Sequence, residues 1–458
     1  MHKRGLFIFR RDLRLTDNTG LLKAKETCET MVPIFIFTPE QVSNKNSYKS
    51  NNAVIFMIES LMDLKKQIDT AGGKLNTLYG DNITVLRHLI KELEIDCICL
   101  NADYTPYSIA RDNAITGLCK KMKIDCIISH DQYLTVPGSV LNGSGEPYQK
   151  FTPYYNTAKK IKVPEPVRAG KIHFVNKIFV TKYNISLETA LEKLTTPNPQ
   201  LMVYGGRDAG VARLKSAVKT QSHYSSTRDL LKNYTSVLSA YIKFGCVSIR
   251  EVYSAFSGNT DFIRELYWRD FYGNIIYSFP RVIGHSQKEK YDKIKWKSSP
   301  ALFDAWCKGR TGFPVVDAGM RQMNTTGYMH NRCRMIVSSF LIKILHIDWR
   351  KGEKYFAEKL VDYDVASNNG GWQWSAGSGA DSQQYNRIFN PYTQGRDYDP
   401  DCVYIKRWVE ELKDVEPEDI HKWDVAREKY QGLKYPEPIV DYKKEREVAL
   451  NMYTSALY

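Results

Sequence analysis

Val32-Pro-Ile-Phe-Ile-Phe37 is a short, continuous apolar run near the start of a chain of 458 residues. Runs of this length and composition are typical of parallel strands that are buried on both faces. Similar runs occupy residues 5–9, 95–100 and 124–129. Between them, residues 52–68 and 82–93 repeat apolar side chains at helical spacing. This alternation predicts a doubly wound α/β domain with a parallel sheet over residues 1–130.

Phosphate-binding glycine motifs are missing from this predicted domain. No GxGxxG follows the first strand, and no GxxxxGK[ST] occurs in the chain. We therefore do not expect a standard dinucleotide or nucleoside triphosphate site here.

The character of the sequence changes twice after residue 130. Prolines and glycines punctuate residues 131–198, which we interpret as an inter-domain linker. From residue 199 to 458, aromatic-rich amphipathic segments follow one another with almost no strand-like alternation. This part predicts a second, all-helical domain.

Composition limits the class of protein and its partners. The chain carries a formal charge of +14, which favours a polyanionic partner such as nucleic acid. A diffusely basic protein without such a partner is the alternative. The nine cysteines form no CxxC pair, so we expect reduced thiols, a cytoplasmic or nuclear location and no metal site. No apolar run is long enough for a membrane span and no signal peptide is evident, so no membrane partner is expected.

Asp362-Tyr-Asp-Val-Ala-Ser-Asn-Asn-Gly-Gly-Trp-Gln-Trp374 has the most unusual composition in the helical part. Its carboxylates and amides can hydrogen-bond a heteroaromatic ring, while its two tryptophans can stack or pass electrons. Such a mixture is poor material for an apolar core. It indicates a site for a redox-active aromatic cofactor.

Glu265, Trp268, Arg269 and Tyr272 are spaced to share one helix face. A tryptophan that stacks, a carboxylate that accepts N–H groups and an arginine that binds phosphate could together bind a flat polar ring. The alternative is an ordinary amphipathic helix with a Glu–Arg pair.

Residues 328–335 form a second candidate group. Asn331 and Met335 are four apart, so an amide and a thioether would line one face. A solvated basic turn is the alternative.

Thr235 and Ser236 precede an apolar helix and could bind a pyrophosphate at its start. Plain N-capping is the alternative there.

Taken in order, these segments closely resemble the photolyase and cryptochrome family. The resemblance covers nearly the whole chain and also rests on four stretches: Phe9-Arg-Arg-Asp-Leu-Arg-Leu-Thr-Asp-Asn18, Lys150-Phe-Thr-Pro-Tyr154, Thr311-Gly-Phe-Pro-Val-Val-Asp317 and Arg387-Ile-Phe-Asn-Pro391. It implies an N-terminal α/β domain and an all-helical C-terminal domain that binds FAD.

The resemblance also implies roles for individual residues. The catalytic pocket for the damaged bases would consist of Glu265, Trp268, Asn331, Met335 and Trp374. FAD would be held by Tyr224, Thr235, Ser236, Val237, Leu238, Ser239, Arg334, Asp362, Tyr363, Asp364 and Asn368. An electron-transfer relay would run from the flavin through Trp372, Trp349 and Trp296. DNA would be contacted by Arg228, Arg269, Arg332, Arg387 and Gln394.

The lesion class is indicated by residues 330–335, His-Asn-Arg-Cys-Arg-Met. They are similar to class I photolyases for cyclobutane pyrimidine dimers, whereas (6-4) photolyases carry catalytic histidines there. The resemblance implies a monomer that repairs UV-damaged DNA by light-driven electron transfer from FADH⁻ to a flipped-out dimer. A cryptochrome-like blue-light photoreceptor is the alternative.

A second, antenna chromophore is also typical of the family. Ser108 stands where members with a folate antenna have a glutamate. A deazaflavin, another flavin or no antenna all stay open.

Overall fold

The computed structural model describes residues 1–457 of the chain. Contacts between residues group it into two compact units. The first unit comprises Met1–Pro197, Val203–Ser222 and Ser236–Pro280, and the second comprises Asn198–Met202, His223–Thr235 and the chain from Arg281 onward.

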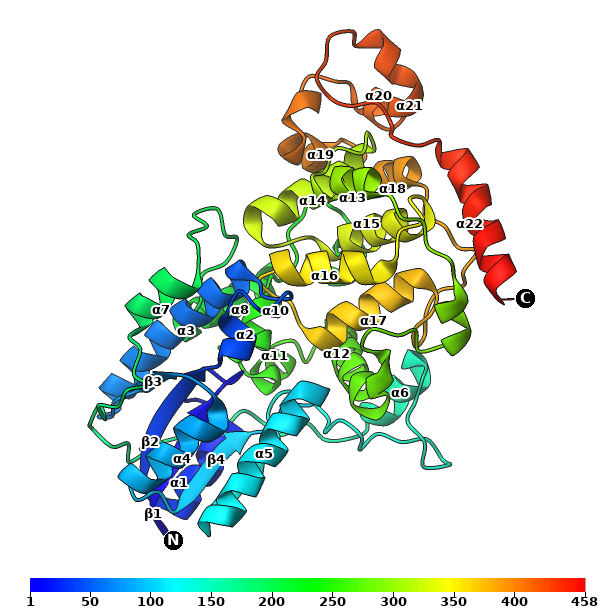
Figure 1. The fold of residues 1–458 in the computed structure, drawn as a ribbon. Helices are drawn as coiled ribbons and strands as arrows, with labels where there is room; N and C mark the ends of the chain where they lie inside the picture. The colour runs from blue at the N-terminus through cyan, green and yellow to red at the C-terminus, as the bar shows by residue number, and fades with distance from the viewer. Residues whose placement is uncertain (458) are drawn as a thin grey trace. The chain divides into compact units, whose positions relative to one another are not determined.

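A five-stranded, fully parallel sheet forms the centre of the first unit, with the strand order β3-β2-β1-β4-β5 (Figure 1). Its strands are β1 (His2–Phe9), β2 (Cys28–Phe37), β3 (Asn76–Tyr79), β4 (Cys97–Asn101) and β5 (Asp125–Ser129). The doubly wound α/β prediction and its four apolar strands are confirmed. Strand β3 was not predicted, since four residues with a single fully apolar side chain give too weak a pattern.

Of the five helices beside the sheet, all but the second begin at a side chain that caps the first turn. They are α1 (Thr19–Thr27), α2 (Pro39–Val42), α3 (Asn51–Thr70), α4 (Asn82–Glu92) and α5 (Pro106–Met122). Side chains of Asn18, Ser50 and Asp81 accept from backbone N–H groups in the first turns of α1, α3 and α4. The predicted helices at 52–68 and 82–93 correspond to α3 and α4. One core joins the strands to apolar residues of α4 and α5, as the pattern of a buried parallel sheet requires.

Residues 131–198, interpreted from sequence as a linker, contain α6 (Phe151–Ala158) and α7 (Leu187–Leu194). Part of this segment is hydrogen-bonded to β2, through Met31 N to His173 O (2.9 Å) and Val175 N to Met31 O (2.8 Å). By contacts it therefore belongs to the first unit up to Pro197. The domain boundaries after residues 130 and 198 stay predictions that rest on the change in amino-acid composition.

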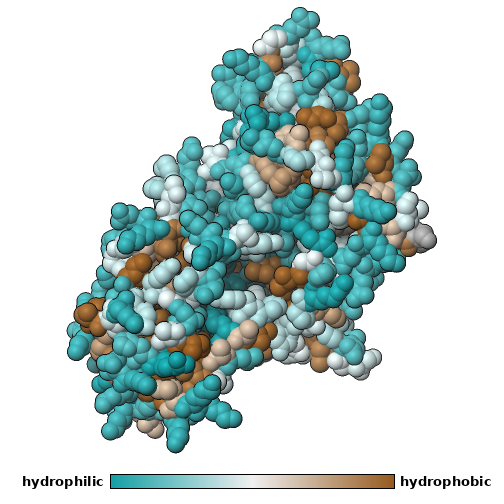
Figure 2. All heavy atoms as spheres, viewed as in Figure 1, coloured by the Kyte–Doolittle hydropathy of each residue, from teal (hydrophilic) through white to brown (hydrophobic). Residues whose placement is uncertain are grey.

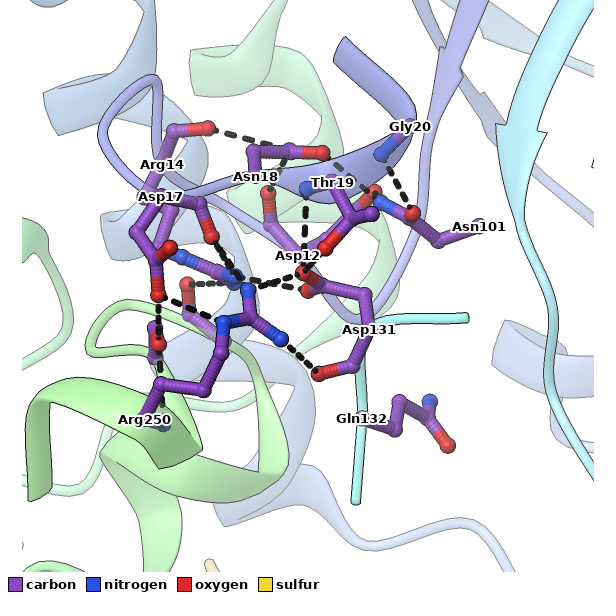
Figure 3. Close-up of polar contacts among 12 residues, drawn as sticks. Asp12, Arg14, Asp17, Asn18, Thr19, Gly20, Asn101, Asp131, Gln132 and Arg250 are labelled. Atoms are coloured by element: carbon purple, nitrogen blue, oxygen red, sulfur yellow. Dashed lines mark hydrogen bonds and ion pairs between the residues drawn. The ribbon is translucent and has the colours of Figure 1, made fainter. Parts of the chain in front are cut away.

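A buried charge network joins distant segments of the first unit (Figure 3). Asp131 binds Arg14 and Arg250 at 2.7 Å each, and Arg250 Nε also donates to Asp17 at 2.9 Å. Burial alone would raise the pKa of Asp131, but the two adjacent guanidinium groups outweigh it and hold the pKa below its usual range. Since all four side chains are buried, each charge depends on its partners.

The rest of the described chain is helical, as predicted. The first unit continues with α8 (Arg207–Thr220), α10 (Ser239–Lys243), α11 (Ile249–Ala255) and α12 (Thr260–Ser278). The second unit contains α9 (Tyr224–Thr227), η2 (Glu289–Lys293), α13 (Pro300–Cys307), α14 (Pro314–Thr326), α15 (Asn331–Lys343), α16 (Trp349–Lys359), α17 (Val365–Ala376), α18 (Pro391–Tyr398), α19 (Val403–Trp408), η3 (Glu410–Leu412), α20 (Pro417–Ile420), α21 (Trp423–Ala426), η4 (Arg427–Lys429) and α22 (Tyr442–Leu457), while η1 (Pro280–Val282) links the two units. A single apolar core, with Trp306, Trp349 and Trp372 among its buried members, holds helices α13 to α17 together.

Apolar side chains are scattered in small groups over the face shown in Figure 2, where hydrophilic residues predominate. Among residues 1–457, no helix combines the length and the apolar character that a membrane crossing needs.

Candidate functional site

The stretch 362–374 folds into the start and body of helix α17. Asp364 is its N-cap and accepts a hydrogen bond from Ser367 N at 3.1 Å. One turn later, Asn368 Nδ2 donates to the backbone oxygen of Glu353 on α16, at 3.0 Å. This bond uses the nitrogen end of the amide and leaves Oδ1 as the end that can accept a further hydrogen bond.

Asp362 lies just before this helix and forms an ion pair with Arg334 of α15. The two side chains are largely buried, and Arg334 Nη2 lies 2.9 Å from Asp362 Oδ2. Burial would lower the pKa of Arg334, but the Asp362 charge outweighs it and the pKa is raised. Arg334 Nε also donates to Met329 O at 2.9 Å, so both charged groups are held in fixed positions.

Glu353 is a feature of this region that sequence analysis missed. Its side chain is 5% exposed and its Oε1 lies 3.4 Å from Asn369 Nδ2. Burial raises the pKa of this carboxyl to about 7. The only signal in the sequence was a glutamate four residues after Trp349, which is an unremarkable pattern in a helix.

The three tryptophans of the predicted relay lie in or against the apolar core of the second unit. Trp372 and Trp349 are buried, whereas Trp296 is only partly buried and packs against the same cluster. Trp372 packs edge-on against Phe356 (4.9 Å between ring centroids) and Trp306 (6.1 Å). Trp372 is 2% exposed and Trp349 0%, so burial does not order these two residues. The greater exposure of Trp296 agrees with its predicted place at the surface end, and the relay itself stays a prediction.

Helix α15 begins with the amide and thioether predicted to share a face. Asn331 Nδ2 lies 3.9 Å from Met335 Sδ, and Asn331 is exposed. Arg332, between them, is paired with Asp229 at 2.8 Å and lies 4.3 Å over the ring of Tyr398. Trp374, another residue of the predicted pocket, is partly buried on α17.

Helix α12 of the first unit carries Glu265, Trp268 and Arg269. Trp268 stacks face to face on Phe151, with ring centroids 3.8 Å apart and 7° between the planes. Phe151 belongs to the 150–154 motif, so that motif fixes the orientation of Trp268. Arg269 donates to Gln132 O at 2.6 Å and lies 4.5 Å over the ring of Tyr133. Its guanidinium is therefore engaged inside the unit, while Glu265 is half-buried.

The hydroxyl-rich segment 235–239 divides between the two units. In the second unit, Thr235 Oγ1 lies 3.3 Å from the hydroxyl of Tyr328. In the first unit, Val237 has a φ of 53°, which a β-branched residue rarely adopts. The start of α10 at Leu238 has no side-chain cap bond. Plain N-capping would give a capped helix start without backbone strain. The positive φ of Val237 and the missing side-chain cap therefore favour a functional role for this segment.

Comparison with known proteins identifies the family. Residues 6–170 match the profile described as DNA photolyase, and residues 262–455 match the FAD binding domain of DNA photolyase. The chain is 34% identical to the deoxyribodipyrimidine photo-lyase of Halobacterium salinarum, over 98% of this chain and 99% of that protein. The chain belongs to the DNA photolyase family.

Solved structures of family members agree with this assignment. An archaeal photolyase from Sulfolobus tokodaii, crystallised with two FAD molecules, is 40% identical, with a TM-score of 0.89 over 99% of this chain and 100% of that chain. A class III photolyase from Agrobacterium tumefaciens is 33% identical, with a TM-score of 0.92 over 100% and 98%. A cryptochrome from Synechocystis is 26% identical, with a TM-score of 0.89 over 99% and 100%.

The residues of this photolyase-family chain fit an FAD group. Asp362 and Asp364 offer fixed carboxylates, and Asn368 presents its amide oxygen, which suits the polar edge of a flavin. Tyr363 and Tyr224 lie partly buried, and Tyr224 packs under Arg228, whose guanidinium lies 5.8 Å from the ring.

The remaining expected DNA contacts lie in the second unit. Arg387 is exposed, with its guanidinium 5.7 Å from the ring of Phe389. Gln394 is partly buried on α18, and its amide oxygen has no hydrogen-bond partner among the described residues. The roles of these two residues stay predictions.

Proposed function

We propose that this chain is a light-driven repair enzyme that splits cyclobutane pyrimidine dimers in DNA, using bound FAD. The observation that supports it most directly is the face of α15, where the Asn331 amide lies 3.9 Å from the Met335 thioether. An amide can hydrogen-bond a pyrimidine edge, and a thioether can pack against the saturated cyclobutane ring. The same segment supports the class I assignment, because Asn331 stands where the His-His-Leu-Ala-Arg run of (6-4) photolyases has its second histidine.

The pocket side chains would bind and orient the lesion. Trp268, held flat by Phe151, would stack on the displaced bases, and Trp374 would also contact the lesion. Glu265 would hydrogen-bond the pyrimidine carbonyl groups when protonated, or their N–H groups when ionised. When bound, the reduced flavin supplies under light the electron that opens the cyclobutane ring.

Asn368 would hold the flavin in its reduced form. Its amide oxygen can accept a hydrogen bond from the ring edge without adding a negative charge. The net charge of +14 would supply DNA affinity that does not depend on sequence and weakens with salt. We further propose that the protein acts as a monomer in the cytoplasm or nucleus.

A second flavin is our proposal for the antenna. The related Sulfolobus tokodaii photolyase holds two FAD molecules. In this chain Ser108 is buried and donates to Asp103 at 2.9 Å, so it is engaged within the α5 N-terminus and cannot replace the glutamate of folate-binding members. Extraction of the purified protein should yield about two flavins per chain; a pterin in the extract would contradict this proposal.

A cryptochrome-like photoreceptor is the second candidate, since a cryptochrome shares the fold at 26% identity. One experiment separates the two functions. Reduced protein is mixed with an oligonucleotide that carries a thymine dimer, under blue light, with a dark control and a (6-4) lesion in parallel. Light-dependent recovery of thymine from the dimer alone supports repair. Bound flavin without repair of either lesion would reject the proposal in favour of light sensing.

A further inference from the structure

Three buried cysteines converge at the centre of the parallel sheet in the first unit. Cys97 and Cys99 lie on one face of β4, and Cys28 begins β2. The three sulfur atoms all lie within 4.8 Å of one another, and those of Cys97 and Cys99 are 3.6 Å apart. Cys28 is 5% exposed and the other two are fully buried. No role of the chain described above uses these thiols.

Gly5 makes this convergence possible. Strand β1 lies between β2 and β4, so a side chain on β2 must cross it to meet β4. A Cβ atom at Gly5 would lie 2.5 Å from Cys28 Sγ, which is closer than atoms can approach. The Cys28 thiol therefore occupies the space that a side chain at position 5 would fill. The same point lies 3.6 Å from the thioether sulfur of Met31, which is itself buried.

We propose that Cys28, Cys97, Cys99 and Met31 form a binding site for one Cu(I) ion. Thiolate and thioether sulfurs are the soft ligands that this ion prefers. Sulfur atoms bound to one metal at about 2.3 Å in a tetrahedral arrangement lie roughly 3.8 Å apart, close to the 3.6 Å found between Cys97 and Cys99. On binding, the ion replaces thiol protons, which pass to solvent, and copper stays in the +1 state.

Two other uses of the cluster fit the structure less well. Structural zinc sites are closed by four cysteine or histidine ligands, and within the described residues this group offers three such ligands with a thioether beside them. A disulfide would join only two of the three thiols. Cys97 and Cys99 are two apart in one strand, so Cys28 would have to be one partner.

The first test measures copper retention by the full-length protein. Purified, reduced protein is given Cu(I) without oxygen, passed over a desalting column with a competing Cu(I) chelator, and analysed for metal. We expect one copper per chain, with an X-ray absorption spectrum that shows sulfur neighbours only. Loss of all copper to the chelator, nitrogen or oxygen neighbours, or preferential retention of zinc would overturn the proposal.

Variants locate the ion. Cys99→Ala removes one ligand, and Gly5→Ala fills the space between the thiols while keeping every sulfur. Each should weaken Cu(I) binding at least about tenfold. Cys246→Ala changes another buried cysteine of the same unit, which bonds Ser60 instead, and should leave binding unchanged. Bound flavin and thermal melting show whether each variant is folded. Equal losses in folded Cys246→Ala and Cys99→Ala would reject this site.

Discussion

At the scale of single residues, Glu353 links burial to pH. Its carboxyl ionises near pH 4.5 in the unfolded chain but at about 7 in the folded one. The folded state therefore binds the extra proton between these values, and stability falls as pH rises through this window. Glu353→Gln should remove the cost of burying an ionised carboxylate, and should stabilise the protein at pH 8 by about 3 kcal/mol.

The measurement is urea unfolding of wild type and variant from pH 5 to 8. Glu358→Gln, a partly exposed position on the same helix, serves as the control and should keep the wild-type pH dependence. If the free energy of unfolding depends on pH in the same way in wild type and Glu353→Gln, Glu353 does not carry the extra proton.

Glu265 is the residue through which α12 would act on the lesion. Glu265→Ala should lower the yield of dimer repair at least about tenfold, because a hydrogen bond to the reacting bases is lost. FAD content should stay near that of the wild type. Asp261→Ala, an exposed position on the same helix, should repair normally. If repair and FAD content fall together, Glu265 supports the fold and does not touch the lesion.

Trp372 is the buried end of the expected relay. Trp372→Phe should slow the light-driven reduction of oxidised flavin, followed by absorbance, because phenylalanine is much harder to oxidise than tryptophan. Repair by protein reduced beforehand should stay largely intact. Trp306→Phe alters a neighbouring ring outside the relay, 6.1 Å from Trp372, and should photoreduce normally. A collapse of repair by pre-reduced Trp372→Phe would remove Trp372 from the relay.

At the scale of elements, the close packing of α16 on α17 depends on Gly352. A Cβ atom there would lie 2.1 Å from the Trp372 ring and 2.6 Å from Leu341. Gly352→Ala should therefore destabilise the protein by about 1–3 kcal/mol in denaturant unfolding. Gly371→Ala is the matched control, since nothing lies near its added methyl group and alanine favours helix. Gly371→Ala should be neutral or stabilising. Equal losses of stability in the two variants would exclude packing against Trp372 as the cause.

At the scale of the whole molecule, the charge network around Asp131 connects parts of the first unit that are far apart in sequence. Asp131→Asn would leave Arg14 and Arg250 buried without their shared partner and should cost about 3–5 kcal/mol at pH 7. Since the pKa of Asp131 is lowered on folding, its contribution is present above about pH 4 and is lost as pH falls further.

Urea unfolding at pH 7 and below pH 4 checks both statements about Asp131. The difference in the free energy of unfolding between wild type and Asp131→Asn should be smaller below pH 4 than at pH 7. Asp125→Asn, whose partner is His2 and whose side chain is 72% exposed, should change stability by less than about 1 kcal/mol. A similar loss in the Asp125 variant would contradict the role of burial.

Local patterns predicted well wherever one segment decides the outcome. The apolar run at 32–37 predicted β2, and helical spacing placed Asn331 beside Met335, because side chains on one element follow its period. Patterns failed where the outcome depends on neighbours. β3 is too short for a period, and nothing near Glu353 in sequence shows that its carboxyl is buried.

From sequence alone, the fold class and the photolyase family were accessible, and candidate site residues could be proposed, because all of these depend on periodicity and on motifs within single segments. Only the tertiary structure brought Asp131 between Arg14 and Arg250, and Cys28 across Gly5 to Cys97 and Cys99. Burial and charge depend on which distant segments pack together. A pattern of nine cysteines without a CxxC pair therefore carried no sign of a cluster that the order of strands creates.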